Sequence, residues 1–221
     1  MTVSADRVVI ICTANVIRSA FVAALLSSRS PHGHRAHLTF DSAGTLARPS
    51  SPADEKVVAL GRTYGLSLEG HRARRLDEGF LRTADTVLCA ERAHRRVVLD
   101  LRPDLISSVF TIREFSRLVE TVPGRAPSWA ALVQAASRSR LSRPPRDAEE
   151  DDMLDPVGGT DAAWLAFERQ ATQAVSSILA ALTALPAPSA AGSSVARPLS
   201  RREYRHAREN ALRGADSSGR S

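Results

Sequence analysis

Short apolar runs alternate along the chain with longer segments in which apolar residues recur at helical spacing. The run 7–12 is rich in β-branched residues and predicts a fully buried strand. Similar runs at 37–41, 85–89 and 107–112 predict three further strands. Helical spacing predicts helices at 18–29, 52–64, 91–101, 113–119, 128–137 and 159–185. The segment 138–155 contains two prolines and many charges, and it predicts a long loop.

The alternation of strands and helices predicts one α/β domain, in which helices cover both faces of a parallel sheet. In folds of this class, ligands bind beyond the carboxyl ends of the strands. The first predicted strand ends at Cys12, so its thiol is expected at this edge of the sheet. This position makes Cys12 the first candidate for a functional residue.

The composition changes at Pro186, where the apolar residues needed for a core largely end. A segment this rich in Pro, Gly, Ser and Arg cannot offset the entropy cost of ordering, so we predict a domain at 1–185 and a disordered basic tail at 186–221. The tail holds seven arginines and three acidic residues, which accounts for most of the net charge of +6. Nucleic-acid-binding domains usually carry their positive charge on the fold, with aromatic residues among the arginines. We therefore expect no nucleic-acid partner.

The apolar segments do not have the form of membrane signals. The apolar residues near the start are too few for a signal-peptide core, and charged residues interrupt the region. The segment 162–185 contains Glu168 and Arg169, which favours an amphipathic helix over a membrane span. Two cysteines are too few for a disulfide framework, which is typical of a reducing compartment. These features predict a cytoplasmic chain without a membrane span.

The residues between the first strand and the first helix form a candidate phosphate-binding loop. Cys12 and Arg18 are separated by five residues, and Ser19 follows. A loop that curls from a strand into a helix N-terminus directs backbone N–H groups into a concavity suited to a phosphate dianion. The same N–H groups favour the thiolate form of Cys12, while Arg18 can bind two phosphoryl oxygens and Ser19 can donate to the thiolate. On these residues alone, a buried structural cysteine beside a solvated arginine is an equal alternative.

Asp155 is a candidate acid catalyst from its own sequence context. It follows an acidic run at 149–152, but Leu154 and Pro156 flank it and restrict its backbone. A carboxyl group held over a bound dianion keeps its proton more readily, as an acid catalyst requires. The simpler alternative is a solvated acidic segment. No cluster of His, Cys and Asp has the spacing of a metal site, so we expect no metal or other cofactor.

Motifs along the chain resemble those of the low molecular weight protein-tyrosine phosphatase family, which is related to thiol-dependent arsenate reductases. They are VVIICTANVIRS (8–19), DSAGT (41–45), PADEKVVALGRTYGL (52–66), EGHRARRL (69–76), ADTVLCAERAH (84–94) and DDMLDPVGG (151–159). The resemblance spans about 7–182 and implies a four-stranded parallel sheet flanked by helices on both faces, with the cysteine loop after the first strand. It also implies a protein-tyrosine phosphatase that acts through a phosphocysteine intermediate.

The resemblance implies a role for each matched residue. Cys12 would be the nucleophile, Arg18 the phosphate clamp, and Asp155 the general acid that protonates the leaving group and then activates water. The phosphate-binding loop would comprise Thr13, Ala14, Asn15, Val16, Ile17, Arg18 and Ser19. Hydrogen bonds that support the loop would come from Asn15, Ser19, Ser42 and His71. Implied partners are a phosphotyrosine protein or a small phosphate ester, and in bacteria a tyrosine kinase or a polysaccharide-synthesis protein.

Several positions depart from the family pattern. Ala14 replaces a glycine, which would cost about 1 kcal/mol if this position has a positive φ. Ile17 replaces a second loop cysteine, so no disulfide within the loop can protect the nucleophile, and Ala20 replaces a proline at the helix start. Val157 and Arg48 stand where aromatic residues usually flank the slot, which weakens the expected stacking on a phosphotyrosine ring. The departures leave the phosphatase chemistry intact and reduce the expected preference for phosphotyrosine.

Two other functions fit the same residues. Related arsenate reductases carry a resolving cysteine at the end of the third strand, where this chain has Cys89. The third cysteine of an internal relay is missing after Cys89, so an arsenate reductase would need an external thiol. A buried core thiol is the simpler interpretation of Cys89. The other alternative is a non-catalytic phosphate-binding relative, although such a protein has no need of Asp155.

Overall fold

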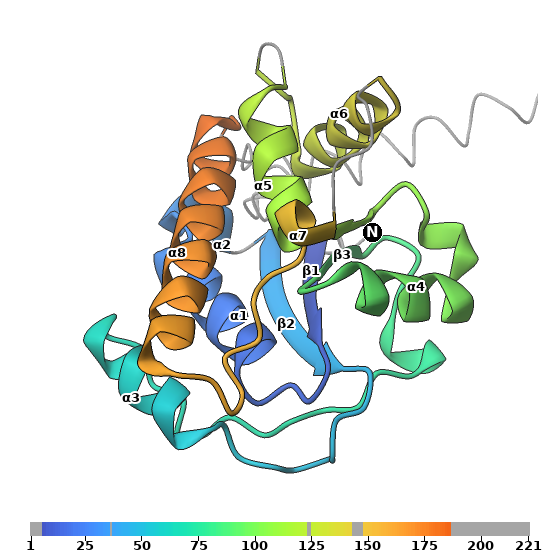
Figure 1. The fold of residues 1–221 in the computed structure, drawn as a ribbon. Helices are drawn as coiled ribbons and strands as arrows, with labels where there is room; N and C mark the ends of the chain where they lie inside the picture. The colour runs from blue at the N-terminus through green and yellow to red at the C-terminus, as the bar shows by residue number, and fades with distance from the viewer. Residues whose placement is uncertain (1–5, 36, 123–124, 143–147, 187–221) are drawn as a thin grey trace, which may run out of the picture. The chain divides into compact units, whose positions relative to one another are not determined.

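The computed structural model describes residues 6–35, 37–122, 125–142 and 148–186. This part of the chain contains a four-stranded parallel sheet with the strand order β2-β1-β3-β4, and Figure 1 shows helices on both sides of it. The strands are β1 (Asp6–Cys12), β2 (Leu38–Gly44), β3 (Thr86–Cys89) and β4 (Val109–Thr111). The predicted α/β class, the parallel direction and the four strands are confirmed.

The helices predicted from apolar spacing all form, with ends that differ from the expected ones by a few residues. They are α1 (Arg18–Arg29), α3 (Glu55–Thr63), α4 (Arg92–Leu101), α5 (Ile112–Glu120), α6 (Trp129–Leu141) and α8 (Asp161–Ala184). The sequence did not predict the short helices α2 (His32–Arg35) and α7 (Ala148–Asp151) or the 3-10 turns η1 (Glu78–Phe80) and η2 (Pro103–Leu105).

The prediction of one long loop over 138–155 is wrong at two places, its beginning and 148–151. Helix α6 continues to Leu141, and α7 forms within the acidic part of the segment. Arginines in the last turn of α6 interact favourably with the negative end of the helix dipole. Arg140 also donates to Glu114 on α5 at 2.7 Å. The arginine-rich composition that indicated a loop is thus compatible with a helix, because Glu114 on α5 forms an ion pair with Arg140.

Strand β1 is buried on both faces because its side chains alternate between two cores. Val8, Ile10 and Cys12 belong to a large core that α1, α5, α6 and α8 cover. Val9 and Ile11 belong to a smaller core that includes residues of α4. Neighbouring residues of one strand therefore lie in different surroundings.

The closing helix α8 covers the large core with Phe167, Ile178 and Leu182, each at most 1% exposed. Leu185 is also buried and follows the end of the helix. Among the residues that the structure describes, no helix combines the length and the apolar character needed to cross a bilayer. The predicted tail, except for Pro186, lies outside the described residues, so its disorder and the boundary at 185 stay predictions.

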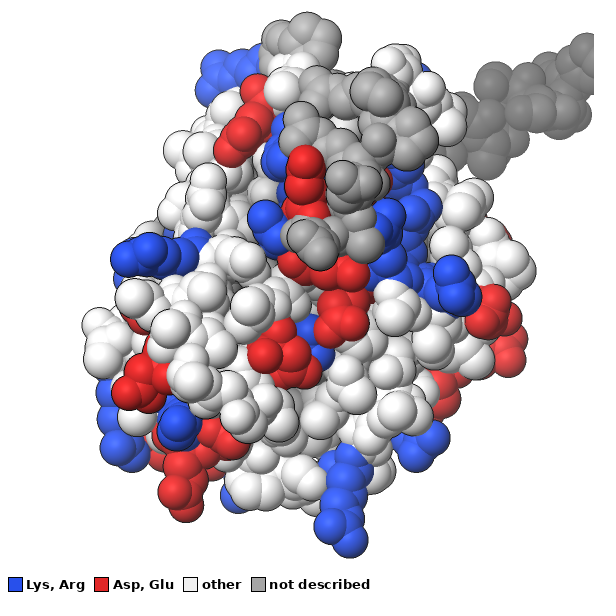
Figure 2. All heavy atoms as spheres, viewed as in Figure 1, with Lys and Arg blue, Asp and Glu red and all other residues white. Residues whose placement is uncertain are grey.

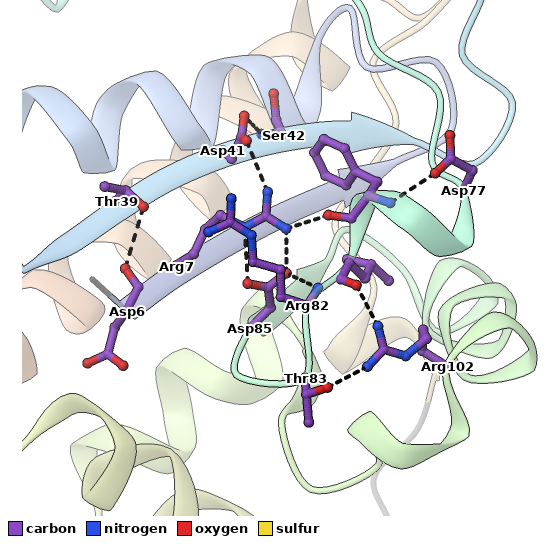
Figure 3. A network of polar contacts seen from close by, with 12 residues as sticks. Asp6, Arg7, Thr39, Asp41, Ser42, Asp77, Arg82, Thr83, Asp85 and Arg102 are labelled. Atoms are coloured by element: carbon purple, nitrogen blue, oxygen red, sulfur yellow. Dashed lines mark hydrogen bonds and ion pairs between the residues drawn. The ribbon is translucent and has the colours of Figure 1, made fainter. Parts of the chain in front are cut away.

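A network of polar side chains joins the beginning of β1 to β2 and to the segment before β3 (Figure 3). Arg7 on β1 donates to both carboxylate oxygens of Asp85, at 3.0 and 2.5 Å, and lies 3.5 Å from Asp41 on β2. Its guanidinium also donates to the Phe80 carbonyl and lies 5.0 Å from the centre of the Phe80 ring. Asp85 is 2% exposed, so loss of Arg7 would leave a buried charge without its partner. The Arg74 side chain pairs with Asp41 and extends the network.

Candidate active site

The loop between β1 and α1 surrounds the Cys12 thiol with hydrogen-bond donors. Cys12 ends β1, and its Sγ lies 3.0 Å from Ser19 Oγ and accepts the Asn15 backbone N–H at 3.3 Å. Ser19 lies in the first turn of α1, where the helix dipole is positive. These donors and the dipole interact more strongly with a thiolate than with a thiol. The Cys12 sulfur therefore lies among hydrogen-bond donors at the start of a helix.

Asn15 organises the loop through hydrogen bonds to three other parts of the chain. Its Nδ2 donates to Ser19 Oγ and to Ser42 Oγ, both at 2.9 Å. Its Oδ1 accepts the Arg74 backbone N–H at 2.9 Å, and its carbonyl lies 2.6 Å from His71 Nε2. The structure thus brings together the predicted supporting residues Asn15, Ser19, Ser42 and His71. Every one of them contacts the loop directly.

The strained backbone position is Asn15 rather than Ala14. Asn15 has a φ of 56°, whereas Ala14 is not among the described non-glycine residues with positive φ. Asparagine occupies this left-handed region more readily than most residues with a side chain. The condition for a cost at Ala14, a positive φ, is therefore not met, and the hydrogen bonds of Asn15 hold the strained residue in place. Around it, Ala14 is exposed, Thr13 and Val16 are half-buried, and Ile17 is buried.

Gly44, the last residue of β2, allows the backbone of the loop to pass close to the sheet. A Cβ atom at this position would lie 2.5 Å from the Thr13 carbonyl oxygen and 2.8 Å from the Asn15 nitrogen. The Thr45 N–H donates to the Cys12 carbonyl and the Leu46 N–H to the Thr13 carbonyl, both at 2.9 Å. This packing is the physical reason for glycine in the DSAGT motif.

Arg18 is 2% exposed, and its two terminal nitrogens contact four acceptors. One nitrogen donates to Asp155 Oδ2 at 2.6 Å and to Thr13 Oγ1 at 3.3 Å. The other donates to the Glu91 carboxylate and to the Met153 carbonyl, the latter at 3.2 Å. The predicted clamp and the predicted acid, 137 positions apart in sequence, therefore touch each other.

The segment before Asp155 is fixed by hydrogen bonds from two directions. The Met153 N–H donates to the Ala90 carbonyl, and the Arg92 N–H donates to Asp152 Oδ1, both at 2.7 Å. From α5, Arg113 donates to the Asp152 carbonyl at 2.8 Å. The Asp155 side chain itself is 42% exposed and is accessible to a substrate. Helix α5 therefore contributes through Arg113 to this positioning.

The sequence did not reveal two polar residues of the site, Glu91 and His94. Glu91 follows β3 and contacts Arg18, while His94 lies 2.9 Å from Thr13 Oγ1. His94 is 5% exposed, and its burial, together with the nearby Arg18 charge, lowers its pKa. Their position along the chain could have identified them, because both residues follow β3. Strand β3 neighbours β1, and its carboxyl end adjoins the loop.

A cleft of about 410 Å³ is lined in part by the three residues Glu91, Met153 and Asp155 that contact Arg18. Figure 2 shows red side chains gathered where α7 and the chain leading into α8 cross this face. The cleft is lined by Glu91, Asp152, Met153, Leu154, Asp155 and Gln170. Leu46, whose N–H donates to the Thr13 carbonyl, is 68% exposed. Val157, which follows the pair Asp155-Pro156, is 66% exposed. The exposed apolar side chains at these two positions are therefore aliphatic rather than aromatic. Arg48, the other position where the family usually has an aromatic residue, is exposed as well.

Cys89 lies in the other core, away from the cysteine loop. Its neighbours there include Val9, Ile11 and Val98, and it has no exposed surface. Burial raises the pKa of the Cys89 thiol far above its usual value. A neutral thiol in apolar surroundings is inert, which agrees with the interpretation of Cys89 as a core residue. Within the described ranges, no three His, Cys, Asp or Glu side chains gather as a metal site requires.

The profile of the family described as "Low molecular weight phosphotyrosine protein phosphatase" matches residues 7–122. The chain belongs to this family. The match includes β1 to β4, the whole cysteine loop, and both Glu91 and His94, whereas Asp155 lies beyond it. The resemblance found in the motifs is thereby confirmed.

Curated relatives in the family include two enterobacterial proteins. The low molecular weight protein-tyrosine-phosphatase Wzb of Salmonella typhi is 31% identical over 104 residues, 47% of this chain and 66% of the relative. The low molecular weight protein-tyrosine-phosphatase Etp of Escherichia coli K12 is 31% identical over 100 residues, 45% of this chain and 64% of the relative. The matched part thus covers slightly less than two thirds of these relatives.

Solved structures share the fold over a longer region than the curated relatives cover. The low molecular weight protein tyrosine phosphatase of T. tengcongensis superposes with a TM-score of 0.57 at 24% identity, over 80% of this chain and 99% of the other. The YwlE arginine phosphatase of Geobacillus stearothermophilus gives a TM-score of 0.58 at 22% identity, over 80% and 93% of the two chains. At these identities the likeness concerns the fold.

Proposed function

We propose that the chain is a phosphomonoester hydrolase, and specifically a protein-tyrosine phosphatase, that acts through a phosphocysteine intermediate on Cys12. The observation that carries this proposal is the meeting of three groups at the carboxyl edge of the sheet. The Cys12 thiol lies among donors, the Arg18 guanidinium lies in the same loop, and Asp155 contacts that guanidinium at 2.6 Å. A nucleophile, an anion clamp and a proton donor are the groups that two-step phosphoryl transfer requires.

In the first step, the Cys12 thiolate attacks the phosphorus atom of the bound ester. The S–P bond forms while the P–O bond to the leaving group breaks, and protonated Asp155 donates its proton to the departing oxygen. Arg18 and the loop N–H groups bind the non-bridging oxygens, on which charge is concentrated in the transition state. The leaving group departs as an alcohol or phenol.

In the second step, the Asp155 carboxylate accepts a proton from water as the water oxygen attacks the phosphocysteine. The S–P bond breaks, inorganic phosphate leaves, and Asp155 regains its proton. The sulfur departs as a thiolate, and Ser19, 3.0 Å from Sγ, is placed to donate a hydrogen bond to it. This contact would lower the barrier to departure.

Phosphate entry has a consequence for Asp155. Arg18 contacts the carboxylates of Asp155 and Glu91. We infer that phosphoryl oxygens replace the Asp155 oxygen on Arg18, since a dianion binds a guanidinium more strongly than a monoanion does. Asp155 would then be released from the guanidinium and would face the bound phosphoryl group. Substrate binding itself would free the acid for proton transfer.

The substrate would be a phosphotyrosine protein or a small phosphate ester. The exposed aliphatic side chains of Leu46 and Val157 offer apolar contact without aromatic stacking, so selectivity for an aryl ring should be modest. Partners in a bacterial cell would be a tyrosine kinase or a protein of polysaccharide synthesis. These assignments rest on the family and on the tyrosine phosphatase names of its curated members.

The deciding experiment measures hydrolysis of p-nitrophenyl phosphate in the presence of EDTA by the full chain and by Cys12→Ser. We expect turnover by the first and none by the second. Equal rates would exclude Cys12 as nucleophile. A panel of phosphotyrosine, phosphoserine and phosphoarginine peptides then ranks the leaving groups. Turnover of phosphoarginine above phosphotyrosine would contradict the tyrosine assignment but not the phosphocysteine mechanism.

The two alternatives are tested by the same preparation. Arsenate-dependent oxidation of an added thiol, without ester hydrolysis, would replace the phosphatase proposal by an arsenate reductase. The opposite-face position of Cys89 disfavours an internal relay, so such an activity would depend on external thiol. Phosphate binding without either activity would indicate a non-catalytic relative.

A further inference from the structure

Thr13 carries a hydroxyl group beside the phosphate cradle, and two neighbours determine its orientation. Its Oγ1 lies 2.9 Å from His94 Nε2 and 3.3 Å from a terminal nitrogen of Arg18. The backbone of Thr13 is fixed as well, because its carbonyl accepts the Leu46 N–H at 2.9 Å. The hydroxyl therefore contacts the guanidinium that is proposed to bind phosphate.

The hydrogen bonds of His94 identify which ring nitrogen carries the proton. The Glu91 backbone N–H donates to His94 Nδ1 at 3.1 Å, so Nδ1 must be an acceptor. In a neutral imidazole the proton then resides on Nε2, and this N–H points at Thr13 Oγ1. His94 is consequently a donor to the threonine.

This assignment leaves one direction for the hydroxyl hydrogen of Thr13. The two lone pairs of Oγ1 accept hydrogen bonds from His94 and from Arg18, so the O–H must donate elsewhere. Among the described residues, no hydrogen bond from this hydroxyl to a protein acceptor is seen. An oxygen of the phosphoryl group bound by Arg18 is the acceptor that the site would bring within reach.

We propose that the Thr13 hydroxyl donates a hydrogen bond to the bound phosphoryl group and that His94 is a positioning residue that directs it. The proposal rests on the proposed function, since it assigns two residues to the same phosphate cradle. Thr13 would touch the substrate, whereas His94 would act only through Thr13. The helix α4, which begins at Arg92, would then contribute to phosphate binding without contacting phosphate.

Four variants separate this role from a structural one. Thr13→Val removes the hydroxyl at almost constant shape, and Thr13→Ser restores it. His94→Gln keeps a side-chain N–H at about the reach of Nε2. His94→Asn keeps an oxygen near the Nδ1 position to accept the Glu91 N–H but is too short to reach Thr13, so it controls for the start of α4.

The primary measurement is the affinity of the full-length chain for inorganic phosphate by isothermal titration, with kcat and KM measured in parallel. Thr13→Val and His94→Asn should each weaken phosphate binding about 10-fold, the effect of one hydrogen bond to a charged group. Thr13→Ser and His94→Gln should bind within about threefold of the parent chain. The double variant Thr13→Val/His94→Asn should be no weaker than the singles, since both remove one interaction.

Unchanged phosphate affinity in Thr13→Val, or additive losses in the double variant, would overturn the proposal. A lowered melting temperature in His94→Asn with normal phosphate affinity would assign His94 to folding alone, which also overturns it. The titration needs no turnover. If the parent chain binds phosphate with the expected variant pattern but hydrolyses no ester, the proposed function fails while this inference stands.

Discussion

Cys12 and Cys89 end neighbouring strands of one sheet, yet their surroundings are opposite. Cys12 Sγ receives the Asn15 N–H and lies 3.0 Å from the Ser19 hydroxyl, at the start of a helix. Cys89 pairs in register with Ile11, one residue before Cys12, and packs among aliphatic side chains of the other core. A shift of one residue along a pleated strand therefore changes a thiol from a candidate nucleophile to a core residue.

Replacement of each thiol by a hydroxyl tests this contrast with the largest expected effect. Cys12→Ser should lose at least about 10⁴-fold in kcat, because removal of a covalent nucleophile removes the main reaction path. Cys89→Ser is the matched control and should keep kcat, with a loss of stability from the buried hydroxyl. Rates on p-nitrophenyl phosphate and melting curves measure both. A large loss of kcat in Cys89→Ser alone would break the comparison.

Replacement of Asp155 sharpens the comparison, because it tests whether catalysis at Cys12 also requires a proton donor. Asp155→Asn should slow hydrolysis of phenyl phosphate about 10²-fold, since the poor leaving group requires a proton. The loss should be smaller with p-nitrophenyl phosphate, whose leaving group departs without protonation. The measurement is kcat/KM over a series of aryl phosphates. Asp161→Asn, at an exposed position in the first turn of α8, is a control, and a flat dependence on leaving group would remove Asp155 from the acid role.

Gly44 is paired in register with Cys12, so it tests how far the loop depends on the sheet beneath it. Gly44→Ala should reduce stability by about 1–3 kcal/mol and lower phosphatase activity, because the added methyl meets loop backbone atoms. Gly70→Ala is a suitable control, since a Cβ there meets nothing within 4 Å. Urea unfolding and phosphate titration distinguish the two, and equal behaviour would contradict the packing argument.

The smallest expected effect is the dependence of stability on pH through His94. Burial lowers the pKa of His94 below its usual 6.5, so the unfolded chain takes up a proton first as the pH falls. Stability should therefore decrease from about pH 6.5 downward, with a contribution of at most about 1.4 kcal/mol per pH unit from this group. His94→Gln should flatten the slope of unfolding free energy between pH 7 and 5. An identical slope in both proteins would show that His94 does not contribute to this pH dependence.

Local sequence signals were sufficient for the strands, for α1 and for the position of the cysteine loop. The run ending at Cys12 contains its own evidence, because a buried strand followed directly by an amphipathic helix leaves the loop little freedom. Ser42 and His71 could be identified as supporting residues only through the family resemblance. Their contacts with Asn15 span 27 and 56 positions, and no local pattern encodes such separations.

The errors and omissions have the same origin. Helix α7 and the end of α6 depend on arginine contacts with other helices, which composition cannot show. Glu91 and His94 look like ordinary residues at the start of a helix until the fold places β3 beside β1. The positive φ lies at Asn15 rather than Ala14, and hydrogen bonds with Cys12, Ser19, Ser42, His71 and Arg74 hold the asparagine there.

Arg74 links the cysteine loop to the polar network around Arg7. Its backbone N–H supports Asn15 in the cysteine loop, while its side chain pairs with Asp41 and thereby with the Arg7 network. Opening of one part would therefore disturb the other. In a native-state hydrogen-exchange experiment, the amide protons of Asn15, Gly44 and Val87 should exchange together as one cooperative unit, with a protection set by unfolding of the sheet rather than by fraying of the loop.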